Sequence, residues 1–308
     1  MNDERSSKQL SARLRGILPP VVTPFNRRGD IDLGAYRANL ERYTGIGLAG
    51  VVVAGSTGEA PYLSARERLR LTELTRRGLE PQELVITGTG LESTRDTIRL
   101  SREAFARGAD AALVVTPNYY KSNMDRPALL AYYRAVADAV ARPVLIYSIP
   151  QFTGIRMTAE LIAELSRHPG IAGVKDSSGD LAVARRILRR VRPGFRVFVG
   201  AATILLDALR AGAAGGILAQ ADFAPELCVA LYEAFRQGSR GRAREFQNQL
   251  EPLVTRVNQP YGVAGIKAAM DLAGYRGGAP RPPLLAATAA ARRDIARALK
   301  QVETDLAY

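Results

Sequence analysis

The sequence predicts a TIM (β/α)8 barrel with additional C-terminal helices. Short runs rich in Val, Ile, Leu and Ala recur about every thirty residues from Gly16 onward, and segments with the apolar spacing of helices separate them. Eight of these units fill about 220 residues, and no glycine-rich dinucleotide fingerprint follows the first run, which favours a barrel over an open doubly wound sheet. The strands are expected to begin near Ile17, Gly50, Leu84, Ala111, Pro143, Ile171, Arg196 and Gly215.

Start and stop signals mark several of the helices between these runs. Ser64, with Glu67 three residues later, has the pattern of a capping box, and Gly108 and Gly212 stand where helices are expected to end. The helices are expected over residues 32–44, 64–78, 93–107, 126–140, 158–167, 180–191, 203–211 and 225–237.

The chain of 308 residues is long enough for one large barrel or for two smaller domains, and no linker divides it. We expect residues 1–15 to form a flexible N-terminal tail and residues 16–238 to form the barrel. Residues 239–308 are rich in alanine and leucine and are expected to add three helices that pack on the barrel.

The net charge of +13 is interpreted as a solvated, arginine-rich surface. Basic residues are spread along the predicted helices beside acidic neighbours, and no long basic run with interleaved aromatic residues occurs. We therefore expect no nucleic-acid partner, although an anionic substrate would be attracted. No apolar stretch reaches the length of a membrane span, and residues 1–15 lack the apolar core of a secretory signal. No membrane association and a cytoplasmic location are expected, with a shortened organellar presequence as the alternative.

Cysteine and histidine usage restricts the possible chemistry. The single cysteine, Cys228, excludes an intramolecular disulfide, and the single histidine, His168, excludes the usual zinc-ligand sets. His168 precedes Pro169 and Gly170, a helix-stop pattern that favours a capping or surface role. No dinucleotide or P-loop motif is present, so we predict neither a cofactor nor a metal. Proton transfer must then fall to tyrosine, serine, threonine, a carboxylate or water.

Lys175 is the candidate nucleophile. It closes the apolar run 171–174 and is followed by a short polar loop, which places its amine at the mouth of a buried strand. Burial there favours the neutral amine, which attacks ketones and forms a Schiff base. Only five of the 43 basic residues are lysines, and arginine, which supplies the rest, cannot form such an adduct. The alternative is a lysine that ends an edge strand and points into solvent.

Polar residues follow most of the predicted strands. Because catalytic residues of such barrels lie at the carboxyl ends of the strands, these segments are expected to surround Lys175 on one face. They provide hydroxyl groups, backbone amides and tyrosines, but no set of metal ligands. The segments are Thr23-Pro24-Phe25, Gly55-Ser56-Thr57-Gly58-Glu59, Thr87-Gly88-Thr89-Gly90, Thr116-Pro117-Asn118-Tyr119-Tyr120 and Tyr147-Ser148.

A 2-keto acid bound to this lysine requires a group that moves protons. Tyr147, one strand away in the predicted barrel, is the candidate proton shuttle. A phenol accepts a proton more readily with help, and a hydroxyl relay through Ser56 to a second phenol, Tyr119, is expected to provide that help.

The same substrate also requires a site for its carboxylate. The glycine-flanked backbone amides of residues 55–58 can bind a carboxylate as a nest, with the Thr57 hydroxyl as a further donor. We expect Glu59 to hold this turn in place rather than to take part in the chemistry.

At these residues the sequence resembles the dihydrodipicolinate synthase and N-acetylneuraminate lyase family, whose members are pyruvate-handling aldolases that use a lysine Schiff base on a TIM barrel. The resemblance covers residues 16–299, nearly the whole chain. It rests on Thr23-Pro24-Phe25, Gly55-Ser56-Thr57-Gly58-Glu59, Thr116-Pro117 with Tyr119-Tyr120, Tyr147 with Pro150 and Thr153-Gly154, and Gly173-Val174-Lys175-Asp176.

The resemblance implies specific roles for these residues. Lys175 would form the Schiff base, Tyr147 would relay protons and Ser56 would supply the relay hydroxyl. Tyr119 would complete the relay, in this family often from a neighbouring subunit, and a homotetramer built as a dimer of tight dimers is expected. The substrate, pyruvate with an aldehyde, is expected to contact Thr57, Gly58, Ser177, Phe152 and Ile217.

Several segments are most similar to 4-hydroxy-2-oxoglutarate aldolase of the mitochondrial type, which implies cleavage of that keto acid to pyruvate and glyoxylate. Thr57 stands where that enzyme has an asparagine, and Phe152 stands where it has a small polar residue. Lysine-pathway synthases carry an arginine at the position of Phe152, and the loss of this carboxylate clamp argues against their semialdehyde substrate. The similar segments are residues 92–94, 108–112, 147–150, 175–177 and 274–278.

Other functions stay open at this point. Within the family, a 2-keto-3-deoxy sugar acid aldolase or dehydratase and a dihydrodipicolinate synthase-like enzyme are alternatives. Phe152 also motivates a hydratase-aldolase for aromatic substrates. Outside enzymes, a keto-acid-binding regulatory barrel is the alternative, although Lys175, Tyr147 and Ser56 argue against the loss of turnover.

Overall fold

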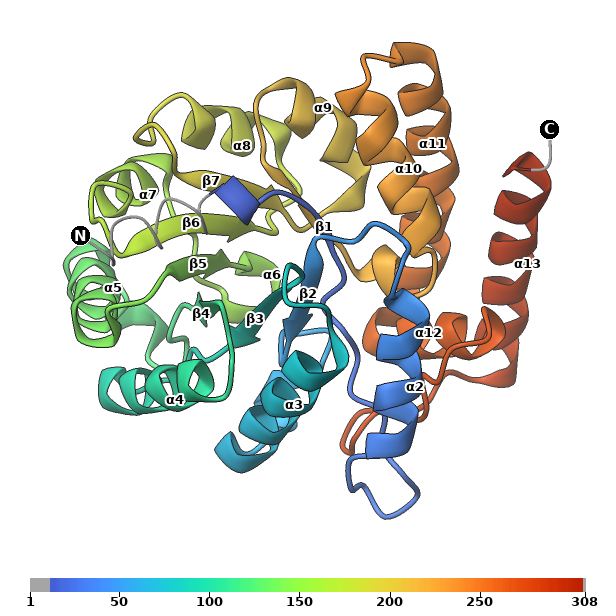
Figure 1. Ribbon diagram of the computed structural model, residues 1–308, viewed down its shortest axis with the longest axis horizontal. Coiled ribbons are helices and arrows are strands. Elements are labelled where there is room, and N and C mark those ends of the chain that lie inside the picture. Colours follow the sequence, from blue (N-terminus) through green and yellow to red (C-terminus); the bar gives the residue numbers. More distant parts are fainter. Residues whose placement is uncertain (1–11, 307–308) are drawn as a thin grey trace.

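The structure is a computed structural model that describes residues 12–306, and it has the predicted barrel architecture (Figure 1). Eight parallel strands form the sheet, with helices around the outside. Each strand begins within one residue of its predicted start. The strands are β1 (Gly16–Leu18), β2 (Gly50–Val53), β3 (Leu84–Gly88), β4 (Ala111–Val115), β5 (Val144–Ser148), β6 (Ile171–Asp176), β7 (Arg196–Val199) and β8 (Gly215–Ile217).

The sheet closes on itself into a barrel. Its hydrogen-bonded order runs β1-β8-β7-β6-β5-β4-β3-β2, and two backbone bonds join the ends. The amides of Ala49 and Val52 donate to the carbonyls of Ile17 and Pro19, each at 2.9 Å. Glycine is required where strands approach closely, because a Cβ at Gly50 would lie 2.1 Å from the Leu84 carbonyl oxygen.

The helices predicted between the strands are present, and α3 has the predicted capping box. The Ser64 hydroxyl accepts from the Glu67 amide at 3.2 Å, and the Glu67 carboxylate accepts from the Ser64 amide at 2.8 Å. A one-turn helix after β5, α6 (Pro150–Thr153), was not predicted. The other helices are α2 (Leu33–Tyr43), α3 (Ala65–Gly78), α4 (Thr94–Ala106), α5 (Arg126–Val140), α7 (Ala159–Leu165), α8 (Leu181–Leu188), α9 (Leu205–Arg210) and α10 (Pro225–Arg236).

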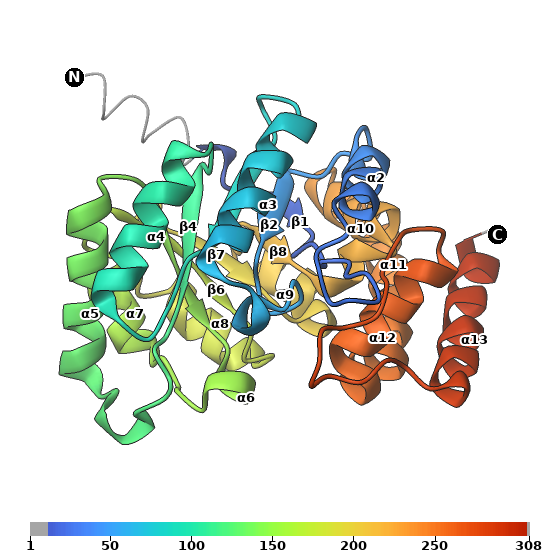
Figure 2. The same cartoon turned by 90° about the horizontal axis from the view of Figure 1, so that it is seen from below.

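Three further helices follow the barrel, as predicted. They are α11 (Arg240–Leu253), α12 (Gln259–Leu272) and α13 (Ala289–Leu306), and both views show them grouped at one side of the barrel (Figures 1 and 2). A π-helical turn, Val254–Asn258, joins α11 to α12. It begins two residues after Pro252, whose backbone nitrogen carries no hydrogen and cannot donate the regular helical hydrogen bond. Gly262 kinks α12 with φ 51° and ψ −139°, a conformation that favours glycine.

The N-terminal boundary lies earlier than residue 16. Residues 1–11 of the predicted tail lie outside the described residues. Leu14 is fully buried in the barrel interior, and the Arg13 guanidinium donates to the Gln82 carbonyl at 2.9 Å. Residues 12–15 therefore belong to the folded barrel.

Two apolar layers hold the barrel together. Inward-facing side chains of alternate strand positions, such as Val52, Ile86 and Phe198, fill the interior, and outward-facing residues pack against the helices. His168 has the predicted capping position, because its Nδ1 accepts from the Gly170 amide at 3.1 Å. Within the described part of the chain, none of the helices combines the length and the hydropathy that crossing a bilayer requires.

Candidate active site

Lys175 and Tyr147 lie side by side inside the barrel, at the carboxyl ends of their strands. Strand register pairs Lys175 with Tyr147 on β5 and with Phe198 on β7. The lysine is 4% exposed, and its Nζ lies 4.4 Å from the centroid of the Tyr147 ring. Within residues 12–306, the Lys175 Nζ forms no hydrogen bond or ion pair. The alternative of a solvent-facing lysine at a sheet edge is therefore wrong, because the closed barrel has no edge there.

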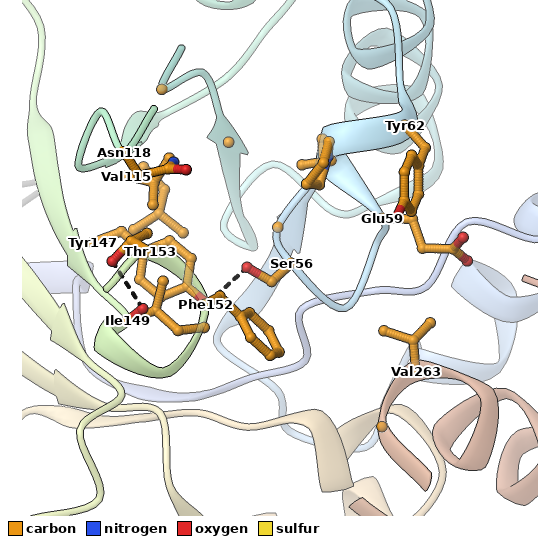
Figure 3. Close-up of a pocket in the computed structure, with 18 of the residues that line it drawn as sticks. Ser56, Glu59, Tyr62, Val115, Asn118, Tyr147, Ile149, Phe152, Thr153 and Val263 are labelled. Atoms are coloured by element: carbon orange, nitrogen blue, oxygen red, sulfur yellow. Dashed lines mark hydrogen bonds between the residues drawn. The ribbon is translucent and has the colours of Figure 1, made fainter. Parts of the chain in front are cut away.

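The Tyr147 hydroxyl reaches the turn that follows β2. It donates a hydrogen bond of 3.2 Å to the Ser56 Oγ, and Figure 3 shows the two side chains pointing toward each other. The phenol ring is 4% exposed, so its position is fixed by the surrounding strands. The contact brings together three of the predicted residues, Lys175, Tyr147 and Ser56, from three strand ends.

The segment after β1 packs closely against the turn that carries Ser56. Thr57 is half-buried, and the Gly58 carbonyl accepts from the Thr23 hydroxyl at 2.8 Å. A Cβ at Gly58 would lie 2.8 Å from the Val21 carbonyl oxygen, so only glycine fits. Glu59 adopts a left-handed conformation with φ 58° and forms an ion pair with Lys267.

Tyr119 does not join the other predicted residues within this chain. Its side chain is 76% exposed and packs edge-on against Tyr120, with ring centroids 5.0 Å apart. The Glu92 carboxylate fixes the backbone of its loop, because it accepts from the amides of Asn118 and Tyr119, each at 2.9 Å.

The remaining predicted residues lie at different depths. Phe152 is 66% exposed and contributes to the wall of a cavity. Ser177 is buried beside Lys175. Its amide donates to the Ser148 carbonyl at 2.9 Å, which fixes the backbone at this position. The Ile217 side chain packs in the barrel interior with 1% exposure.

A cavity of about 820 Å³ opens in front of Tyr147 and Ser56. Apolar and aromatic side chains form most of its wall, including Ile149 and Phe152 (Figure 3) and Val263 from the C-terminal helices. The wall includes three charged side chains, Glu59, Arg68 and Glu92, and each already bonds to the protein. Residues 12–306 contain no group of three or more His, Cys, Asp or Glu side chains arranged to hold a metal ion.

Gly200, which the sequence analysis did not single out, shapes the space around Lys175. It follows β7, and a Cβ there would lie 1.9 Å from the Ser177 Oγ and 3.2 Å from the Lys175 Cε. A side chain at this position would therefore clash with Ser177 and crowd the lysine. A glycine after a strand is too common a pattern to reveal this contact from sequence.

Asp222 is a second residue that the sequence analysis missed. Its carboxyl group is fully buried, with Oδ1 accepting from the Val22 amide at 3.2 Å and Oδ2 without a hydrogen-bond partner among the described residues. Burial raises the pKa of Asp222 to about 8, although the charge of Lys175 opposes this rise. Burial therefore favours the protonated form of this carboxyl group at neutral pH.

The closed barrel and the lysine, tyrosine and serine at its mouth define a (β/α)8-barrel protein with a buried lysine beside a tyrosine–serine pair. The model of the dihydrodipicolinate synthetase family matches residues 13–302, and the chain belongs to this family. Membership makes the protein a carbon–carbon lyase of the pyruvate-dependent aldolase class.

Curated relatives include two activities. The 4-hydroxy-tetrahydrodipicolinate synthase of Methanoculleus marisnigri is 35% identical over 87% of this chain and 92% of its own length. The probable mitochondrial 4-hydroxy-2-oxoglutarate aldolase of Emericella nidulans is 37% identical over 88% of this chain and 89% of its own length.

Solved structures agree with the fold. The prophage protein YagE of Escherichia coli K12, of the dihydrodipicolinic acid synthase family and solved in complex with pyruvate, is 30% identical with a TM-score of 0.89, covering 94% of this chain and 98% of that protein. A sialic acid aldolase of Ruminococcus gnavus, solved as a catalytic lysine mutant, is 25% identical with a TM-score of 0.88, covering 96% and 97%.

Proposed function

We propose that this protein is a class I aldolase in which Lys175 forms a Schiff base with the keto group of a 2-keto acid. The reaction is the reversible cleavage of the keto acid to pyruvate and an aldehyde, and 4-hydroxy-2-oxoglutarate is the first substrate to test. The observation that carries the proposal is the buried Lys175 against the Tyr147 ring, whose hydroxyl bonds to Ser56.

Each step uses groups that lie at this site. The neutral Lys175 amine adds to the C2 carbonyl, and loss of water gives the iminium. Removal of the proton from the C4 hydroxyl lets the C3–C4 bond break; its electron pair moves into the iminium to form an enamine, and the aldehyde leaves. Protonation of the enamine at C3 and hydrolysis then release pyruvate and restore the amine.

Tyr147 moves these protons in the proposed mechanism. Its ring packs against the Lys175 Nζ, and the hydrogen bond from its hydroxyl to Ser56 provides a route toward the cavity. Thr57, the amides around Gly58, Ser177 and Ile217 are proposed to bind the pyruvyl part of the substrate. The Ruminococcus gnavus aldolase, which has a catalytic lysine, and the pyruvate complex of YagE support a lysine-dependent site for pyruvate.

We also propose that a neighbouring subunit completes the relay in a homotetramer. Tyr119 is too exposed to contact Tyr147 within one chain, whereas Glu92 holds its backbone in a defined position. A side chain that is ordered but exposed at the mouth of the site is suited to insertion into a partner's site.

The aldehyde half is assigned from the relatives and from Phe152. The 37% identical Emericella nidulans protein supports 4-hydroxy-2-oxoglutarate, whereas the Methanoculleus marisnigri relative supports a synthase reaction as the second candidate. The phenyl ring of Phe152 in the cavity wall cannot clamp a carboxylate, and this argues against the semialdehyde substrate of that synthase. Glyoxylate also bears a carboxylate, so the preference for 4-hydroxy-2-oxoglutarate rests on the Emericella nidulans relative. An aldolase or dehydratase for 2-keto-3-deoxy sugar acids is the next candidate.

The substitution Phe152→Arg is expected to shift specificity toward aldehydes that bear a carboxylate. The guanidinium would enter the cavity wall and could bind such a carboxylate with two hydrogen bonds, which raises kcat/KM for succinate semialdehyde or glyoxylate relative to an uncharged aldehyde by about tenfold. Aldol addition to pyruvate with a panel of aldehydes measures the ratio. An unchanged ratio would show that residue 152 does not contact the substrate.

The proposed function is tested by trapping the Schiff base. The protein is incubated with pyruvate and sodium borohydride, and its intact mass and peptide map are recorded. One reduced pyruvate adduct, located on Lys175, is the expected result. No adduct on a folded protein would contradict the aldolase proposal and favour a regulatory barrel without turnover.

A further inference from the structure

A second buried lysine, Lys267 on α12, lies behind the active-site turn. Its side chain is 1% exposed, and its Nζ forms an ion pair of 2.5 Å with the Glu59 Oε1. The same Nζ donates to the carbonyls of Thr23 at 2.8 Å and Ala279 at 2.9 Å. These three oxygen atoms surround the Nζ, so Lys267 is a structural lysine and not a second nucleophile. Burial lowers the pKa of Lys267, and the Glu59 carboxylate opposes this effect.

Glu59 connects this ammonium to the turn that carries Ser56. It ends the turn in a left-handed conformation, and its amide donates to the Ser56 carbonyl at 3.1 Å. Its second carboxylate oxygen, Oε2, accepts from the Arg281 amide at 2.8 Å. Figure 3 shows Ser56 and Glu59 on opposite sides of the turn, with Ser56 toward Tyr147 and Glu59 away from it.

The surrounding contacts make this connection rigid. The Phe25 ring lies between two cations, 4.5 Å from the Lys267 Nζ and 4.3 Å from the Arg281 guanidinium. That guanidinium also pairs with Glu67 at 2.6 Å. A Cβ at Gly277 would lie 2.0 Å from the Lys267 carbonyl oxygen, so the segment after α12 packs directly on the lysine's backbone.

Burying two charges costs desolvation free energy, which an apolar pair of the same size would avoid. The Glu59–Lys267 ion pair instead fixes the geometry of the turn that carries Ser56, the residue that accepts the hydrogen bond from Tyr147. We propose that Glu59 and Lys267 are positioning residues that hold Ser56 within hydrogen-bond reach of Tyr147, so that the C-terminal helices form part of the active site. The proposal rests on the proposed aldolase function.

The test compares three pairs of changes in the full-length chain. Glu59→Gln with Lys267→Met removes both charges together and leaves no unpaired buried ion. The matched control, Arg76→Met with Asp110→Asn, removes a partly buried pair of 3.4 Å that lies before β4, at the opposite end of the barrel. Glu59→Gln with Lys267→Gln, which also leaves no unpaired buried ion and keeps a polar side chain at both positions, is a milder second variant, should the first fail to fold.

The expected result has three parts. The Glu59/Lys267 variant still gives the borohydride-trapped pyruvate adduct on Lys175, while its kcat falls about tenfold or more and KM changes less. The Arg76/Asp110 control keeps kcat within about twofold. In a Ser56→Ala background the Glu59/Lys267 changes lower kcat by less than about twofold, because their effect acts through Ser56.

Two results would overturn the proposal. A folded Glu59/Lys267 double variant, with either methionine or glutamine at position 267, and a kcat within twofold of the natural protein would show that the turn does not depend on the pair. An equal loss of kcat with and without Ser56 would show a general structural effect. Absence of the adduct in the unchanged protein would instead contradict the aldolase function itself, so the two failures are distinguishable.

Discussion

Replacement of Lys175 by alanine is expected to lower kcat for keto-acid cleavage by more than about a thousandfold, because no other group can form the iminium. Lys267 cannot substitute for it, since it does not line the cavity and its Nζ already pairs with Glu59 and donates to two backbone carbonyls. Cleavage is followed by coupling released pyruvate to lactate dehydrogenase, and the borohydride adduct is measured by intact mass.

The fold should survive this change. No ion pair or hydrogen bond to Lys175 exists within residues 12–306, so alanine leaves no unpaired buried charge behind, and circular dichroism and Tm should stay close to those of the natural protein. Lys300→Ala, at an exposed lysine of α13, is the matched control and should retain activity. Residual activity of Lys175→Ala above one tenth of the natural value would rule out the Schiff-base mechanism.

Tyr147→Phe is expected to lower kcat by about a hundredfold to a thousandfold, the range for loss of a positioned acid–base group. The change removes only the hydroxyl that donates to Ser56 and keeps the ring that packs against the Lys175 Nζ. The pyruvate adduct should therefore still form, although more slowly. Single-turnover kinetics with trapping separate the two steps.

Tyr133→Phe provides a matched control for this prediction. Tyr133 on α5 is also fully buried, and its hydroxyl donates to the Val114 carbonyl at 3.1 Å in the layer between helix and barrel. Its loss should cost about 1–3 kcal/mol of stability and leave kcat within about twofold. If both tyrosine variants lost the same activity, Tyr147 would have only a structural role.

The spacing of apolar runs and the residues that begin and end helices were sufficient to predict the fold. The recurrence of apolar runs every thirty residues predicts the strands because each inward or outward side chain must be apolar in a closed parallel barrel. Local signals also located the Ser64 capping box, since a cap depends on residues only three positions apart. The short helix α6 was missed because one turn carries too few residues to show a period.

The site was predicted from sequence in part. Lys175, Tyr147 and Ser56 were placed on one face because strand ends of a barrel converge there, and the structure brings them together. Tyr119 was assigned to the same relay from its place after a strand and by resemblance, but a single chain leaves it 76% exposed. Its proposed partner belongs to another subunit, which the residues of one chain do not reveal.

What the sequence determined by itself is the barrel, its C-terminal helices and the strand-end lysine with its neighbouring hydroxyl groups, because each follows from spacing along the chain. Only the tertiary structure decided which distant groups support them. Lys267 and Glu59 are 208 positions apart and show no pattern in common, yet they meet as a buried pair behind Ser56. Asp222 and Gly200 likewise acquire their relation to Lys175 only when the last strands close the barrel beside it.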